Sequence, residues 1–483
     1  MTEKRLFTAT FFAFLLFSVP VWAETLTLTE EKVVDLFLEK NLDIQLFEAD
    51  RKISETEIQK AKSAFDTTLN SRVDYLINKK DQAIPLFGTD NRTLNFDVEA
   101  SKSFPTGTRT EAFWRNHRES TNSSFAVLNP FYEPTLGLEA RQPMLRNFAG
   151  RVDRGNVSIA RQRFKAVDTL TRRRILEALR PVALTYWKWI RDLNNLEITR
   201  RSLEEAARLE ETTRLKLSFA LNDTTDVVAS KANRVRIESD VMTAQLEGDI
   251  SRLKLRELLN LPPETSFVAK EKIPAVQKAP PVEDALAFAF ANRADYKAAM
   301  GELEAKNLEV KVAGYRKWPE LDLIATLETN GVDRSFGQSL SEAFTADHPS
   351  FLVGGQFQWT IENRFAKSEA KRLEMEKLKS VLGLKQLENQ IVREVETAWK
   401  EVKNQERQVS NRRKIEELER EKWSLELEKY KTGRSSSDLV IRFQEDYLSA
   451  QRESLNALYF YRQAWLDLLL AQDRLLPGQG EAK

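Results

Sequence analysis

The chain has 483 residues, with 74 lysines and arginines against 73 aspartates and glutamates, and it contains no cysteine. The balanced charge argues against a nucleic-acid-binding protein, and the lack of cysteine excludes disulfides, thiol catalysis and cysteine-based metal sites. Charged residues make up 30% of the chain while glycine and proline are scarce, which suits long solvated helices. No catalytic motif and no spacing of metal ligands is present in the sequence, so we expect a protein without enzyme activity, metal or other cofactor.

The N-terminus has the pattern of a secretory signal. Lys4 and Arg5 precede an apolar stretch, and Val21-Trp22-Ala23 forms a cleavage site of the small-residue type. We therefore expect residues 1–23 to be a signal peptide and the protein to be exported.

The remaining sequence consists of two similar halves, residues 24–263 and 282–477. Each half is predicted to contain a short amphipathic helix, a second helix, a block of strands, a very long helix, a break and a shorter helix. The Pro- and Lys-containing residues 264–281 are expected to link the halves, and residues 478–483 to form a tail.

The long helices carry a narrow apolar ladder that is typical of coiled-coil packing, for example Leu176, Leu179 and Ala183. At 1.5 Å per residue each long helix would span roughly 100 Å, and the shorter helices only about half of that. The helices predicted at about 47–64 and 298–316 are expected to stack end to end on the shorter ones and supply the missing length.

The predicted strands lie at about 66–143 and 319–362, where one apolar face alternates with one polar face. This pattern is typical of an outer-membrane β-barrel around a watery lumen, and equally of a soluble antiparallel sheet. Trp318 and Trp359 at strand ends favour the barrel, because aromatic residues gather at membrane interfaces. A single chain has too few strands to close a wide pore, so a barrel requires an oligomer. The alternating segments are 69–77, 94–101, 108–116, 136–141, 321–328 and 351–361.

The breaks in the helices are FALNDTTDVV (219–228) and YKTGRSSSDLV (430–440). Gly433 and the serines after it permit a reversal of the chain, and Asp438 is expected to cap the returning helix. In the first break Asn222 tolerates the left-handed conformation of a turn. We interpret the two segments as hairpin tips, at about 219–226 and 430–438.

These features together resemble the TolC family of outer-membrane efflux proteins. The residues that carry the resemblance are EARQPMLRNFAGRVDRGNVSIARQRF (139–164), ALTYWKWIRDLNNLEI (183–198), LRELLNLPP (255–263) and YKTGRSSSDLV. The resemblance covers essentially the whole mature chain. It implies a mainly α fold with a membrane β-barrel portion, built from duplicated strand hairpins and long coiled-coil helices.

The resemblance also implies a location and partners. A homotrimer in the cell outer membrane would form a twelve-stranded barrel in contact with outer-membrane lipid, continued by a periplasmic tunnel of helices. The tunnel would dock on a periplasmic adaptor (membrane fusion) protein and an inner-membrane transporter, and would passively export drugs, ions or a polypeptide, as in type I secretion. No nucleic acid is expected as a partner.

The first strand block departs from the family pattern. Four alternating segments lie between Asp66 and Gln142, where the family pattern needs two. The extra pair, at about 93–116, either enters the barrel wall and gives a trimer of eighteen strands, or lies outside it. We expect the second arrangement, with twelve strands.

The resemblance further implies a gate at the periplasmic aperture, where the tips of a trimer converge. The candidate gate residues are Tyr430, Arg434, Asp438 and Asp226, and the first three are candidates for polar contacts between protomers. The alternative is that they are only turn and N-cap residues, since serine and aspartate are ordinary caps. Adaptor docking is expected at the tips, whose candidate residues are Leu221, Asn222, Thr224, Thr225, Gly433, Ser435, Ser436 and Ser437.

The alternative interpretation is a periplasmic coiled-coil scaffold or adaptor without a pore. An adaptor would have one helical hairpin flanked by compact β domains. The sequence instead repeats the hairpin, each time with its own strands, and this favours the channel.

Overall fold

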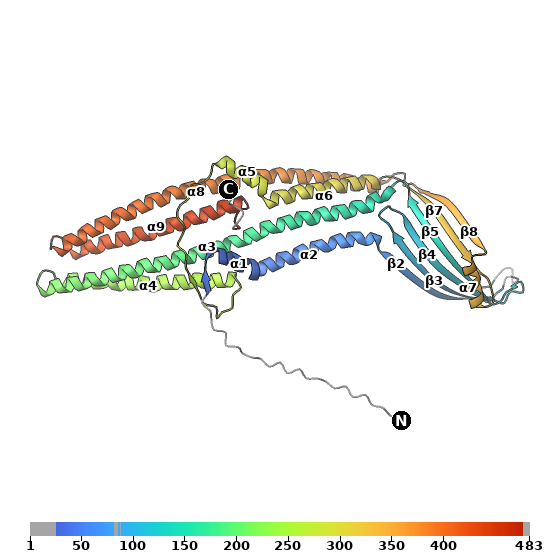
Figure 1. Cartoon of the computed structure of the whole chain (residues 1–483), viewed down its shortest axis with the longest axis horizontal. Helices are drawn as coiled ribbons and strands as arrows, with labels where there is room; N and C mark the ends of the chain where they lie inside the picture. Colours follow the sequence, from blue (N-terminus) through green and yellow to red (C-terminus); the bar gives the residue numbers. More distant parts are fainter. Residues whose placement is uncertain (1–25, 82–85, 87, 477–483) are drawn as a thin grey trace, which may run out of the picture.

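The computed structural model describes residues 26–81, 86 and 88–476, so the expected signal peptide and C-terminal tail lie outside the described residues. The molecule is elongated, with helices running along most of its length and a β-sheet at one end (Figure 1). In the first half the elements are β1 (Leu26–Leu28), α1 (Glu30–Lys40), α2 (Leu42–Lys62), β2 (Thr67–Asn78), β3 (Asn91–Ser103), β4 (Arg109–Thr121), β5 (Phe131–Pro143), α3 (Arg151–Ser218) and α4 (Thr224–Leu258). In the second half they are β6 (Phe267–Ala269), α5 (Val282–Asn292), α6 (Ala294–Arg316), β7 (Glu320–Asn330), α7 (Phe336–Thr345), β8 (Pro349–Gln358), α8 (Arg364–Lys431) and α9 (Ser437–Ala471).

The long helices α3 and α8 have 68 residues each, and α4 and α9 have 35 residues each. In the first half α2 begins where α4 ends, so that the two together run beside α3 (Figure 1). The Asn41 amide donates a hydrogen bond to the Leu258 carbonyl at 2.8 Å, and the Asn260 amide donates to the Lys40 carbonyl at 3.2 Å. These bonds satisfy backbone carbonyls at two helix ends, which would otherwise lack partners.

The second half joins α9 to α6 in a comparable way. The Ala294 N–H donates to the Asp473 carboxylate at 2.7 Å, and the buried Arg293 guanidinium donates to the Ala471 carbonyl at 3.3 Å. Arg293 also pairs with Asp295 and Glu394. Burial lowers the pKa of Arg293, but its hydrogen bonds to the two carboxylates outweigh that effect and raise it. The predicted end-to-end stacking of helices is confirmed in both halves.

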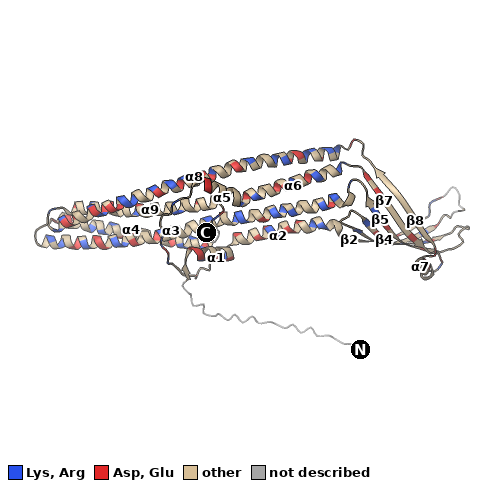
Figure 2. Ribbon diagram, turned by 45° about the horizontal axis from the view of Figure 1, so that its top comes forward, with Lys and Arg blue, Asp and Glu red and all other residues tan. Residues whose placement is uncertain are grey.

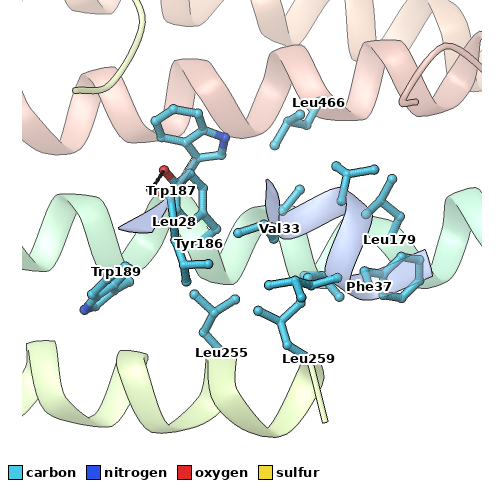
Figure 3. Packing of buried hydrophobic residues seen from close by; sticks show 14 of the residues in the cluster. Leu28, Val33, Phe37, Leu179, Tyr186, Trp187, Trp189, Leu255, Leu259 and Leu466 are labelled. Carbon is cyan, nitrogen blue, oxygen red and sulfur yellow. Dashed lines mark hydrogen bonds between the residues drawn. The ribbon is translucent and has the colours of Figure 1, made fainter. Parts of the chain in front are cut away.

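The main hydrophobic core lies where α1 packs against the middle of α3 (Figure 3). Tyr186 and Trp187 of α3 are almost completely buried there, together with Phe37 of α1 and Leu255 of α4. The Tyr186 hydroxyl donates to the Glu271 carboxylate at 2.9 Å, so the polar tip of this buried side chain is satisfied. The aromatic stretch 183–198 is therefore structural in this chain, because it packs the short N-terminal elements onto the long helix.

Residues 264–281 do more than connect the two halves. They contain β6, which pairs in parallel with β1, and Leu26 lies opposite Phe267 in that pair. Phe267 is 4% exposed and contacts the ring of Trp189 edge-on, with the centroids 5.3 Å apart. The segment expected as a linker is thus a packed part of the core.

The six long strands form one antiparallel sheet in the order β2-β3-β4-β5-β7-β8. The extra hairpin β3–β4 lies inside this sheet, between β2 and β5, so the expectation that it lies apart from the other strands is wrong. The reason is register. Val73 of β2 pairs with Phe96 of β3, and Val98 pairs with Trp114 of β4, so the apolar residues of the hairpin continue the apolar face of its neighbours.

The sheet has one apolar and one polar face. The apolar face carries Leu69, Val73, Tyr75, Leu94, Phe96, Val98, Ala112, Trp114, Tyr132, Leu136, Leu138, Leu323, Ala325, Leu327, Phe351, Val353 and Phe357. The polar face carries ten carboxylates, Asp74, Asp97, Glu99, Glu111, Glu119, Glu133, Glu139, Glu320, Asp322 and Glu328, and four arginines, Arg72, Arg109, Arg115 and Arg141. Many side chains of the apolar face are exposed to solvent in the single chain, Leu69 and Phe351 to 71% each.

Helix α7 was not anticipated from the sequence. It lies on the apolar face of the sheet, where the Phe336 ring contacts Tyr132 at a centroid distance of 5.8 Å and Trp114 at 6.5 Å. With ten residues it is too short for helical periodicity to stand out from its surroundings. Among the described residues, no helix combines the length and the apolar character needed to cross a membrane.

Candidate functional site

The two hairpin turns lie together at the end of the molecule opposite the sheet (Figure 1). One turn joins α3 to α4 and the other joins α8 to α9. The side chains of Leu209 on α3, Tyr430 on α8 and Val440 on α9 form a small buried cluster just behind them. Each turn is therefore held against the other within a single chain, and this pair of turns is the candidate site. We call it the tip.

The turns use left-handed residues at different positions from those expected. Gly433 has a φ of 76°, as a reversal after α8 requires, and its neighbour Arg434 donates its N–H to the Lys429 carbonyl at 2.8 Å. In the first turn the left-handed residue is Ala220, with a φ of 56°, and not Asn222. The side chain of Asn222 has another role, because it reaches the second turn.

The helix caps also differ from the expected ones. Ser436 is the N-cap of α9, since its hydroxyl accepts the N–H of Leu439 at 3.4 Å. Asp438, expected to be the cap, lies in the first turn of the helix, where its negative charge interacts favourably with the exposed backbone N–H groups. In the other hairpin Asp223 and Asp226 form a capping box at the start of α4.

Tyr430 holds the two turns together. Its side chain is 1% exposed, and its hydroxyl lies 2.9 Å from the Thr213 hydroxyl of α3. The Asn222 amide donates to the same phenolic oxygen at 2.9 Å, while the Thr213 hydroxyl donates to the Leu209 carbonyl at 2.8 Å. Tyr430 can thus accept from Asn222 and donate to Thr213, which in turn donates to Leu209, so both hydroxyl groups have an acceptor.

Lys216 of α3 packs over the ring of Tyr430 and is a further contact between the two hairpins. Its ammonium nitrogen lies 3.7 Å from the centroid of the Tyr430 ring and donates to the Tyr430 carbonyl. Burial lowers the pKa of the Lys216 ammonium, because a charge is less stable away from water. Lys216 thus provides a hydrogen-bond donor for a backbone carbonyl at the end of α8, where a positive charge also interacts favourably with the helix dipole.

Two carboxylates complete the tip. Asp226 accepts a hydrogen bond from the hydroxyl of Ser437, which joins α4 to α9. Glu426 accepts from Ser435 of its own turn and pairs with Lys429 at 3.1 Å. The hydrogen bond from Ser435 and the nearby Lys429 hold the pKa of the Glu426 carboxyl below its usual range.

The four candidate gate residues do not have equivalent positions. Tyr430 and Asp226 bridge the two hairpins of one chain, whereas Tyr430 was expected to contact a neighbouring protomer. Arg434 and Asp438 are exposed, and Arg434 donates to Thr432 of its own turn at 3.1 Å. Both charges are therefore accessible to a neighbouring molecule.

The candidate docking residues are mostly on the surface. Leu221, Thr224, Thr225, Gly433 and Ser436 are exposed, and Asn222 and Ser435 are half-buried. Ser437 is completely buried against Asp226, so it cannot form part of a docking surface. The exposed side chain of Phe219, at 73%, adds an apolar group beside Leu221 that the sequence analysis did not single out.

Sequence reasoning also missed Thr213, Lys216 and Glu426. All three lie inside the long helices, outside the turn segments, so composition did not distinguish them from other residues of a solvated helix. The local sequence offers a threonine followed by a lysine three positions later. This pattern does not reveal the contact, because Thr213 bonds Tyr430, which is 217 residues away.

Comparison with known proteins places this geometry in a defined class. No family model matches the chain, and no curated protein matches it significantly by sequence. Solved structures do match. The outer-membrane channel OprN superposes with a TM-score of 0.68 at 16% identity, over 92% of this chain and 89% of OprN.

Two further structures agree. CusC, described for its folding and transmembrane channel formation, has a TM-score of 0.68 at 15% identity, over 92% of this chain and 91% of CusC. The open state of the Neisseria gonorrhoeae MtrE outer-membrane channel has a TM-score of 0.66 at 16% identity, over 92% of this chain and 89% of MtrE.

The chain therefore shares the fold of these channel proteins. The resemblance to the TolC family is confirmed at the level of the fold, along almost the whole described chain.

Proposed function

We propose that this protein is an outer-membrane channel that exports solutes, and that three copies of the chain together close the wall of its barrel. The observation that carries the proposal is the combination in one chain of a two-faced open sheet with helices of 68 residues, about 100 Å long, that end in paired tips. The likeness to OprN, CusC and MtrE supports the same function and an outer-membrane location.

The edges of the sheet support the trimer. Within the described residues β2 and β8 each have one strand neighbour, so both present a row of backbone groups without strand partners. In hydrocarbon such groups must be paired, and pairing β2 of one protomer with β8 of the next closes the wall. The apolar face then contacts lipid and the polar face surrounds water, which is the arrangement of membrane barrels.

The helices continue the wall on the periplasmic side. Each chain supplies four helical columns: α3, α8, the stack of α4 with α2, and the stack of α9 with α6. Charged residues of both signs cover these columns along their length (Figure 2). Such a surface suits a hollow, water-filled assembly whose helices contact one another through narrow apolar seams.

The tip is the gate in this proposal, and it has two levels. Within a chain, Tyr430 and Asp226 hold the α8–α9 turn to the α3–α4 turn. Between chains, the exposed Arg434 and Asp438 bind neighbouring protomers and narrow the aperture. Phe219 and Leu221 form the apolar part of the surface that docks a periplasmic adaptor, which in turn joins an inner-membrane transporter.

Site-directed cross-linking tests the trimer, because the protein has no cysteine of its own. Val73→Cys on β2 is combined in turn with Phe351→Cys, Val353→Cys and Gly355→Cys on β8. Oxidation of membranes is expected to join chains into dimers and trimers for at least one combination. Val73→Cys with Leu138→Cys on the interior strand β5 is the control and is expected to give no cross-link.

Function is tested on the purified protein in planar lipid bilayers, where we expect single-channel conductance. A soluble periplasmic monomer without cross-links and without conductance would contradict the proposal and would favour a coiled-coil scaffold.

A further inference from the structure

The hairpin β3–β4 occupies the middle of the sheet, so its effect on the pore can be derived from geometry. It pairs along its full length on both sides, from Thr67↔Lys102 to Asn78↔Asn91 with β2 and from Arg109↔Arg141 to Glu119↔Phe131 with β5. Each chain therefore brings six strands to the wall, and a trimer brings eighteen.

The width of the barrel follows from the strand number. Strands lie about 4.8 Å apart and tilt by about 40° in barrels, so each occupies roughly 6.3 Å of circumference. Eighteen strands then give a diameter of about 36 Å between backbones, whereas four strands per chain would give about 24 Å. Side chains extend about 5 Å from a sheet on each side, which leaves bores of roughly 26 Å and 14 Å.

The helical tunnel has a matching size. Twelve helical columns at interaxial distances of 8–10 Å have a circumference of roughly 110 Å, and eighteen strands have about the same.

The hairpin also contributes to the lining of the pore. Its polar face carries Asp97, Glu99, Glu111 and Glu119 against Arg109 and Arg115. Arg115 pairs with Glu99 at 2.9 Å and with Glu111 at 3.6 Å, so the two signs are partly compensated within the hairpin. The polar face of the whole sheet still has six more carboxylates than arginines per chain. A wide lumen of this kind concentrates cations.

We propose that the β3–β4 hairpin widens the membrane pore so that the channel passes bulky cationic cargo that a barrel of four strands per chain would hold back. A bore of about 14 Å admits a single α-helix, which is 10–12 Å wide with its side chains, and a bore of about 26 Å admits a helical hairpin. The inference rests on the proposed trimeric channel, and it adds the size and the charge of the cargo.

The test compares the full chain with a variant that lacks residues 91–130. In this variant residues 79–90 connect β2 to β5 directly, and pairing Asn78 with Phe131 keeps the apolar residues of both strands on one face. Poly(ethylene glycol) of increasing size is added only to the extracellular side of a planar bilayer, so that filling of the barrel is measured independently of the tip. We expect exclusion at about 26 Å for the full chain and about 14 Å for the variant, with the full chain selecting K⁺ over Cl⁻.

The outcomes separate the two proposals. Absence of conductance from the full chain would overturn the channel itself and this inference with it. Conductance with the same exclusion size in both proteins, or with a preference for Cl⁻, would leave the channel standing and overturn the widening or the charge of the cargo.

A second measurement decides the question if the variant does not fold. Glu99→Cys and Val98→Cys are made in the full-length chain, where each is the only thiol. With the hairpin in the wall, a charged membrane-impermeant thiol reagent modifies Glu99→Cys and reduces the conductance, while Val98→Cys faces lipid and does not react. Equal reaction at both positions would overturn the inference, because it would place the hairpin outside the wall.

Discussion

The phenolic oxygen of Tyr430 on α8 lies 2.9 Å from the hydroxyl of Thr213 on α3, and this contact joins the two halves of the chain at their far ends. Both side chains are buried, and the Asn222 amide reaches the same phenolic oxygen. Since α8 and α3 belong to different hairpins, an outward movement of one hairpin relative to the other at the tip breaks this contact.

Tyr430→Phe is therefore expected to favour the open tip. The change keeps the ring but removes the hydroxyl that bonds both Asn222 and Thr213, and the loss of hydrogen bonds at a buried site costs about 1–3 kcal/mol. At about 1.4 kcal/mol per factor of ten, the open-to-closed ratio rises by roughly one to two orders of magnitude, measured as open probability in planar bilayers. The control is Tyr296→Phe, whose hydroxyl contacts Glu388 on α8 far from the tip. Equal conductance of Tyr430→Phe and the unmodified protein would remove Tyr430 from the gate.

Arg434 and Asp438 give a different prediction, since both are exposed within the chain. If they bind neighbouring protomers, Arg434→Ala with Asp438→Ala opens the trimer and raises its conductance. Lys431→Ala serves as the control because Lys431 is an exposed cation of the same tip that pairs only locally, with Glu428 at 2.9 Å. Unchanged conductance of the double variant would show that these charges only terminate and begin helices.

Acid is expected to loosen the tip through Glu426. Ser435 and Lys429 of the same α8–α9 turn lower its pKa, so the ionised form stabilises this turn above the ordinary carboxyl pKa, and the stabilisation is lost as the pH falls through the lowered value. Conductance should therefore rise when the periplasmic side is brought below about pH 4, the usual range of a glutamate.

The variant Glu426→Gln separates this carboxyl from the others. It should raise conductance at neutral pH and reduce the further rise in acid. Glu428→Gln is the matched control, because Glu428 lies two positions away with its side chain 69% exposed. If both variants retain the same acid response as the unmodified protein, Glu426 is not its source.

Phe267 tests whether residues 264–281 stabilise the core. Phe267→Ala removes a buried ring, which typically costs about 3–5 kcal/mol, and should lower the free energy of unfolding accordingly. Val268→Ala on the same strand is the control, since Val268 is half exposed and should change stability by much less. Thermal unfolding of the detergent-extracted protein measures both, and equal melting temperatures would mean that this segment is a tether only.

Local periodicity explains which elements could be predicted. Helix α8 spans Arg364–Lys431, in agreement with the strands expected up to about 362 and the break expected at 430–440. Strand alternation located all six long strands, although β4 extends to Thr121, beyond the expected end near 116. Helix α7 and the short pair β1–β6 were missed, because ten and three residues carry too little periodicity.

The tip shows why site residues were harder to assign. Gly433 is recognisable by itself, because few other residues adopt its left-handed conformation without strain. The roles of Tyr430, Asp226 and Ser437 depend on which side chains of the other hairpin lie opposite them. That choice is made by the packing of α3 against α4 and α9 and has no local signature.

The amino-acid sequence by itself determined the long helices, the reversals between them and the two-faced strands, because each of these depends on residues a few positions apart. Only the tertiary structure decided that β3–β4 lies within the sheet, that residues 264–281 are packed in the core, and that Tyr430 meets Thr213. These depend on which of several compatible faces come together, and the burial and hydrogen bonding that select among them arise between residues far apart in the chain.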